Sequence, residues 1–211
     1  YPLRRQRQMC IRDSFKDGCY KVDMLCCQLN INMLRKFDFV IPNPKPKFIP
    51  MDIIYGLIAN KWYLSTFKNK IALIGGKAKM DVIKNLMKYE EYRNYVKNDS
   101  FLDYIEVPER FSCDNTELLS KEIGEKIKNS KAEVFLFGIG ISKMAIAHKF
   151  KNYKNSLFID IGCGMSALAG TVETDRPYFG SWTNYRLRNY NYSDVDTTSF
   201  NSYRDNVKIL D

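Results

Sequence analysis

Short apolar runs that end in glycine or proline recur along the chain, and longer stretches with apolar residues at helical spacing separate them. Runs of this length and composition predict strands. The predicted strands are residues 37–42, 70–76, 103–108, 133–140 and 156–162. Four of them are nearly continuous in apolar residues, which is typical of strands that are covered on both faces of a parallel sheet.

Three segments between these runs are predicted to be helices, namely residues 79–98, 114–130 and 141–153. The second begins with Asp or Asn as its N-cap, and the third follows directly on a Gly-x-Gly turn. The apolar faces predicted for the first two consist of Val82, Ile83, Leu86, Met87 and Tyr92, and of Leu118, Leu119, Ile123 and Ile127. The alternation predicts an α/β fold with a Rossmann-like, doubly wound, mostly parallel sheet in a single domain.

The length of 211 residues suits one substantial core. Residues 1–14 contain four Arg, show no apolar periodicity and resemble translated sequencing adapter, so they are interpreted as an artefact and the natural N-terminus is expected to be missing. The Rossmann-like domain is expected over residues 15–180. Residues 181–211, rich in Tyr and Asn, are expected to form a C-terminal tail or lid.

Charge and cysteine content narrow the classes of partner. The formal net charge is +9, and outside the first fourteen residues the basic side chains are mostly Lys on helix-like stretches, which favours a solvated surface over a nucleic-acid interface. The six cysteines form no C-x-x-C pair, which indicates reduced thiols and neither disulfides nor structural zinc. With no apolar run long enough to span a bilayer, a cytoplasmic protein without an integral membrane segment is expected.

Glycine pairs at three predicted strand ends indicate where a ligand binds. In doubly wound sheets ligands lie beyond the carboxyl ends of the strands, where glycine lets the backbone come close and the next helix offers amide donors to a diphosphate. Strand-to-helix turns also use glycine for structural reasons alone, but three such pairs together favour a nucleotide-type site. The pairs are Gly75 with Gly76, Gly138 with Gly140, and Gly162 with Gly164.

The stretch from Asp160 to Gly164 also matches the start of the glycine motif of S-adenosylmethionine-dependent methyltransferases. The third glycine of that motif falls on Ser166, and the short remainder of the chain has no apolar runs to supply the strands that normally follow. A permuted methyltransferase therefore stays an alternative. A non-catalytic Rossmann-like binding module is a second alternative.

The segment "VFLFGIGISKMAIAHKFKNYKNSLFIDIGCGMSALAG" resembles the C-terminal half of the bacterial glycosyltransferases with the GT-D fold, as do "WYLSTFKNKIALIGG" and "IEVPERFSCDNTELLSKEI" upstream. The resemblance implies transfer of a sugar from a nucleotide diphosphate, such as a UDP-sugar, to a hydroxyl of a glycan or glycoprotein acceptor. It also implies a divalent cation, Mn or Mg, held by an Asp-Gly-Glu type motif. The nearest counterpart here is Asp17-Gly18-Cys19, which lacks the Glu.

On this interpretation the turns Gly138–Ser142 and Gly162–Ser166 contact the nucleotide. Arg176 either closes over the diphosphate or lies on the surface, and Asp160 either orients a ribose hydroxyl or accepts hydrogen bonds from loop amides. Asp175 and Glu173 are candidates for acceptor base or metal ligand, with Asp17 as a further metal candidate. The predicted nucleotide-sugar contacts are Gly75, Gly76, Gly138, Gly140, Ser142, Asp160, Gly162, Gly164, Ser166 and Arg176. His148, the single histidine, is expected to pack rather than to catalyse.

Overall fold

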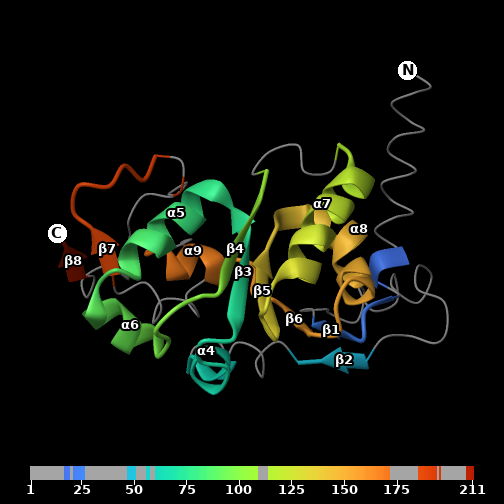
Figure 1. Ribbon diagram of the computed structural model, residues 1–211, viewed down its shortest axis with the longest axis horizontal. Helices are drawn as coiled ribbons and strands as arrows, with labels where there is room; N and C mark the ends of the chain where they lie inside the picture. The colour runs from blue at the N-terminus through green and yellow to red at the C-terminus, as the bar shows by residue number, and fades with distance from the viewer. Residues whose placement is uncertain are drawn as a thin grey trace.

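A four-stranded parallel sheet is the centre of the molecule (Figure 1). The computed structural model describes residues 17–19, 21–26, 47–50, 56–57, 60–108, 114–171, 185–193, 195 and 208–211. The strands are β3 (Ile71–Gly76), β4 (Asp103–Val107), β5 (Val134–Gly138) and β6 (Leu157–Asp160), in the order β4-β3-β5-β6. Four of the predicted strands are thereby confirmed, and the fifth, residues 37–42, lies outside the described residues.

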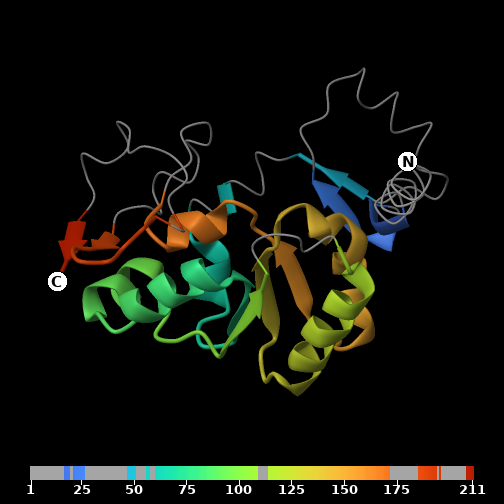
Figure 2. The ribbon, with the colours of Figure 1, turned by 90° about the horizontal axis from the view of Figure 1, so that it is seen from above.

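Helices cover both faces of the sheet, as Figure 2 shows from above. One layer contains α5 (Lys77–Leu86), α6 (Glu90–Val96) and α9 (Gly164–Leu168). The opposite layer contains α7 (Thr116–Asn129), α8 (Lys143–Ile146) and the 3-10 helix η2 (Ala147–Asn152). A short helix, α4 (Trp62–Thr66), precedes β3. The predicted Rossmann-like, doubly wound α/β architecture is confirmed.

The order of the strands defines a topological switch point. β3 comes first along this sheet and lies inside it, with β4 on one side and β5 on the other. The connection that leaves β3 runs through α5 over one face, and the connection that leaves β5 runs through α8 and η2 over the opposite face. The two connections therefore diverge beyond the carboxyl ends of β3 and β5. In open α/β sheets this divergence creates the crevice where ligands bind.

Side-chain alternation along β3 builds a core on each face. Ile71 and Leu73 face α5 and α9, whereas Ala72 and Ile74 face α7 and α8, and all four are 0% exposed. β6 behaves differently because it pairs only with β5 among the described strands. Its Leu157 is 44% exposed, so the prediction that this run is covered on both faces is wrong for β6.

The predicted helix 79–98 is two helices rather than one. Tyr89 is extended, with φ −92° and ψ 128°, and the Arg93 Nη1 donates to the Met87 carbonyl at 2.8 Å, which caps the end of α5. The break turns the chain but keeps the apolar pattern, since the five side chains predicted to face the core are buried. The apolar periodicity therefore predicted correctly which side chains are buried, but it predicted one continuous helix where there are two.

The other two predicted helices differ from expectation in smaller ways. Asn115 caps α7 through a hydrogen bond from the Leu118 amide at 3.0 Å, as the N-cap pattern predicts. Leu118 itself is 51% exposed and does not share the buried face of Leu119, Ile123 and Ile127. Residues 141–153 are helical but irregular, because only α8 is α-helical between η1 (Gly140–Ser142) and η2.

Two small parallel pairs flank the central sheet. β1 (Met24–Cys26) pairs with β2 (Lys47–Ile49), and β7 (Tyr185–Leu187) pairs with β8 (Lys208–Leu210). Tyr185 is 6% exposed and packs at the α6 layer. Tyr185, which lies in the predicted tail or lid, 181–211, therefore belongs to the core of the domain. Residues 1–14 lie outside the described residues. No helix in the described ranges has the length and apolar character needed to cross a membrane.

Candidate functional site

The predicted glycine turns meet at the carboxyl edge of the sheet. Gly75 pairs with Gly138 across the β3–β5 ladder, and Phe137 pairs with Asp160 across the β5–β6 ladder. The strands are parallel, so the turns that follow β3, β5 and β6 all emerge at this edge. The structure thus brings together the three glycine pairs that the sequence predicted as a group.

Gly75 and Gly138 make room for neighbouring protein atoms. A Cβ at Gly138 would lie 2.7 Å from the Gly162 carbonyl oxygen and 3.1 Å from the Met165 Cβ. A Cβ at Gly75 would lie 2.7 Å from the Met80 Cε and 3.4 Å from the Met165 Cγ. Met165 is fully buried above these two glycines, so the close packing of α9 against the sheet explains why residues without a side chain stand at both positions.

Gly140 and Gly162 have more open surroundings. Both adopt positive φ, +61° at Gly140 and +46° at Gly162, which strongly favours glycine. Apart from the adjoining residues of the chain, no described atom lies within 4 Å of a Cβ built at Gly140, and at Gly162 only the Asp160 Oδ1 is near, at 3.8 Å. Compared with Gly75 and Gly138, these two glycines leave more space for a ligand close to the backbone.

An ion pair joins the turns that follow β5 and β6. The Lys143 Nζ lies 2.5 Å from the Asp160 Oδ2, and the other carboxylate oxygen, Oδ1, accepts a hydrogen bond from the Gly162 amide at 2.9 Å. The structure therefore shows the loop-amide role among the two predicted for Asp160. Lys143 was not predicted, and its position three residues after the Gly-x-Gly turn is only a weak signal in the sequence.

The remaining predicted contacts in these turns are engaged within the protein. Ser142 is fully buried and its hydroxyl donates to the Ile139 carbonyl at 2.7 Å. Ser166 is 5% exposed, and its carbonyl accepts from both the amide and the hydroxyl of Thr171. The Gly164 amide donates to the Ile161 carbonyl at 2.7 Å. These bonds fix the shape of both turns.

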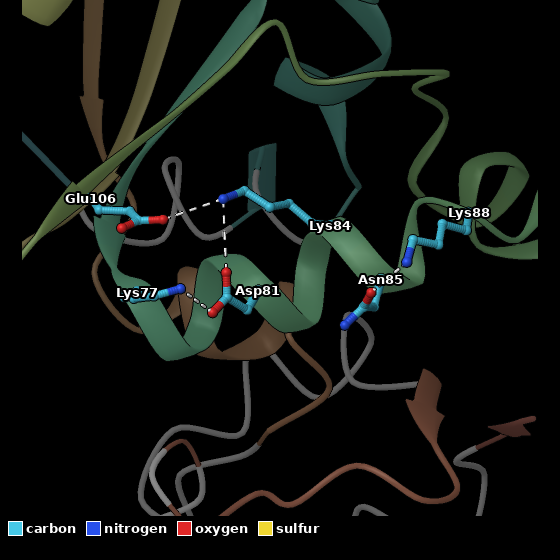
Figure 3. A network of polar contacts seen from close by, with 6 residues as sticks. All are labelled: Lys77, Asp81, Lys84, Asn85, Lys88 and Glu106. Atoms are coloured by element: carbon cyan, nitrogen blue, oxygen red, sulfur yellow. Dashed lines mark hydrogen bonds and ion pairs between the residues drawn. The ribbon is translucent and has the colours of Figure 1, made fainter.

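The helix α5, which begins at this edge, carries a second set of charges along its length (Figure 3). Gly76 is the N-cap of this helix and offers no side chain to its first amides. Lys77 lies 2.6 Å from Asp81, and Lys84 lies 3.3 Å from Glu106, at the end of β4. The hydrogen bond to Asp81 raises the pKa of Lys77.

Asp17, the predicted metal ligand, lies near α8 on the side of the α7 layer. It forms an ion pair with Lys21 at 2.6 Å, and that hydrogen bond lowers the pKa of its carboxyl. The next residue, Gly18, packs against the carbonyl of Met144 so closely that a Cβ there would overlap it. No group of three or more His, Cys, Asp or Glu side chains in the described ranges is arranged to hold a metal ion.

His148 lies in η2 beside this N-terminal segment. Its Nδ1 is buried and has no hydrogen-bond partner within the described part of the chain. Burial lowers the pKa of the imidazole, and the positive charges of Lys149 and Lys21 lower it further. The histidine is therefore neutral at pH 7. Glu173, Asp175 and Arg176 lie outside the described residues.

The chain matches no protein-family model, no curated protein and no solved structure. The resemblance to the GT-D glycosyltransferases accordingly rests on the order of motifs in the sequence. The candidate site rests on the geometry of the carboxyl edge, where the turns after β3, β5 and β6 meet.

Proposed function

We propose that this protein is a glycosyltransferase that moves a sugar from a nucleotide diphosphate, such as a UDP-sugar, to a hydroxyl of a glycan or glycoprotein acceptor. The observation that supports this most is the switch point between β3 and β5, where the Gly138–Ser142 turn lies beside the Gly162–Ser166 turn. A crevice at a switch point with glycine-rich turns suits a nucleotide, because the backbone can approach the ribose and phosphates closely.

The chemistry requires stabilisation of a leaving group. As the bond between the sugar and the diphosphate breaks, negative charge grows on the diphosphate, so fixed cations and amide donors that face it lower the barrier. The described edge supplies Lys143, Lys77 and the uncapped first turn of α5. A divalent cation, Mn or Mg, would add Lewis-acid stabilisation when bound, with Asp17, Glu173 and Asp175 as the proposed ligands or acceptor base.

A methyltransferase is the second candidate, because Asp160 to Gly164 carries the start of the matching glycine motif. The position of that motif weakens this candidate. It follows β6, which comes last along the sheet and pairs only with β5 among the described strands, whereas the switch point lies between β3 and β5. The glycine turns that directly follow the two strands of the switch point are those after β3 and β5.

Ligand-induced stabilisation of the full chain tests the proposal. UDP with Mn²⁺ and S-adenosylhomocysteine are compared, with uridine as the control that lacks the diphosphate. A ligand at about 100 times its dissociation constant stabilises the fold by roughly 2.7 kcal/mol, which a thermal unfolding curve resolves. Stabilisation by UDP but not by uridine supports the proposal, and stabilisation by S-adenosylhomocysteine alone contradicts it in favour of a methyltransferase. No shift with any ligand contradicts both and favours a binding module.

A further inference from the structure

We propose that Lys143 binds the diphosphate of the donor nucleotide and that Asp160 is the counter-anion that it exchanges for the ligand. This inference rests on the proposed function and adds to it a specific recognition residue. The pair spans two turns at the carboxyl edge, since Lys143 follows the turn after β5 and Asp160 ends β6. A ligand that enters between these turns meets the ion pair.

The accessibility of the pair favours an exchange. The side chains of Lys143 and Asp160 are 32% and 35% exposed, so water and solutes reach both charged groups. Three residues before Lys143, Gly140 holds a left-handed conformation with no described atom within 4 Å of its Cβ position. The turn that leads into Lys143 therefore has open space beside its backbone at Gly140.

The hydrogen bonding of Asp160 makes it suited to release the lysine. Its two carboxylate oxygens have separate partners, because Oδ1 accepts from the Gly162 amide and Oδ2 faces the ammonium. When Lys143 turns to a phosphate oxygen, the first hydrogen bond remains and keeps the carboxylate in place. A charged hydrogen bond to the diphosphate then replaces the charged hydrogen bond to Asp160. Because the diphosphate carries more negative charge than a carboxylate, the exchange favours the ligand.

Lys77 and Lys84, the lysines of α5 described above, form ion pairs that do not join two turns. Lys77 pairs with Asp81 four residues later on the same helix, and Lys84 lies between Asp81 and Glu106 (Figure 3). These contacts lie along the outer surface of α5 and do not connect the turns after β5 and β6. Of the lysines in these pairs, Lys143 is the one that bridges the two predicted nucleotide-binding turns.

The proposal predicts opposite effects for the two members of the pair. Lys143→Met removes the cation, so the affinity for UDP should fall by about tenfold or more, the usual worth of a hydrogen bond to a charged group. Asp160→Asn keeps an oxygen acceptor for the Gly162 amide but removes the competing charge, so the affinity for UDP should rise by roughly threefold to tenfold. A pair with a purely structural role would weaken binding in both variants.

Isothermal titration calorimetry of the full chain with UDP, and with inorganic pyrophosphate as a probe without the nucleoside, measures these affinities. Lys149→Met, in η2, is the matched control for loss of one positive charge and should bind UDP like the wild type. Lys143→Arg keeps the charge and should bind within about threefold of the wild type, which separates loss of the cation from loss of folding. Circular dichroism verifies that each variant is folded.

The outcomes separate this inference from the proposed function. If the wild type binds UDP and Lys143→Met binds it equally well, the inference is wrong while the proposed function stands. Loss of affinity in both Lys143→Met and Asp160→Asn also overturns it and indicates a structural role. If the wild type binds neither UDP nor pyrophosphate, the proposed function and the inference fail together.

Discussion

Gly75 and Gly138 occupy paired positions in the sheet but tolerate a methyl group differently. At Gly138 the obstacle is the backbone carbonyl of Gly162, which cannot move without shifting the turn. At Gly75 the nearest atom is the flexible end of the Met80 side chain. We expect Gly138→Ala to lower the free energy of unfolding by roughly 1–3 kcal/mol and Gly75→Ala by less than about 1 kcal/mol. Urea unfolding measures both, and a larger loss for Gly75→Ala would contradict this account of the packing.

The single histidine predicts a pH dependence of stability. The pKa of His148 is lowered in the folded protein, chiefly by burial, so the unfolded chain takes up a proton first as the pH falls. The contribution of His148 to the free energy of unfolding should therefore have its full value above about pH 6.5, the pKa of an unperturbed histidine. The free energy of unfolding should decrease as the pH falls below that value. Urea unfolding of the wild type and of His148→Gln at about pH 7.5 and about pH 5.5 tests this. The same decrease in both proteins would exclude His148 as its source.

The sequence indicated Asp160 but gave little indication of its partner. The carboxylate stands at the end of an apolar run before a glycine turn, a pattern that a reader of the sequence can recognise. Lys143 reaches it only because β5 and β6 pair in a register that opposes Phe137 to Asp160. Such a contact depends on the alignment of two strands rather than on local spacing, so it became visible only in the folded protein.

At the scale of the elements, the central and edge strands should differ in their sensitivity to substitution. Leu136 of β5 is fully buried, whereas Leu157 of β6 is 44% exposed. Leu136→Ala should cost roughly 2–5 kcal/mol of unfolding free energy, because it removes buried methyl groups and leaves a cavity. Leu157→Ala should cost less than about 1 kcal/mol. Equal losses in urea unfolding would show that β6 is covered to the same extent as β5.

The elements also show how far the sequence could be interpreted. The strands β3, β5 and β6 were recognisable because each is an apolar run that ends in glycine or in an acid two residues before a glycine. The break between α5 and α6 was not recognisable, since the residues from Met87 to Tyr89 include neither Pro nor Gly. Here the tertiary structure overrides the local helical preference, and the Arg93 side chain satisfies the Met87 carbonyl that the break leaves open.

For the molecule as a whole, a chain segment near the C-terminus contributes to the stability of the domain. Tyr185 packs edge-on against Tyr92 and Tyr95, with ring centroids 5.9 Å and 4.7 Å apart. Tyr185→Ala should therefore lower the free energy of unfolding by roughly 3–5 kcal/mol, as expected for a large buried aromatic side chain. A single cooperative transition monitored by both fluorescence and circular dichroism is also expected.

The matched control comes from the paired strand β8. Lys208 forms an ion pair with Glu91 at 2.6 Å on the surface of α6. Because both groups are well exposed, Lys208→Met should change the free energy of unfolding by less than about 1 kcal/mol.

A Tyr185→Ala variant that unfolds like the wild type would show that β7 lies apart from the cooperative core.

The strand order also has a consequence for how the chain folds during synthesis. Among the strands of the central sheet, β3 emerges from the ribosome first and β4 follows as its earliest partner. The pairing of Ile71 with Val134 must wait until α7 and β5 have been made. Until then, one edge of this apolar strand stays open to other nascent chains, a risk for strands whose partners are distant in sequence. Slow translation between residues 108 and 134 would prolong this interval, so that stretch of the message is where codon choice should affect the yield of folded protein most.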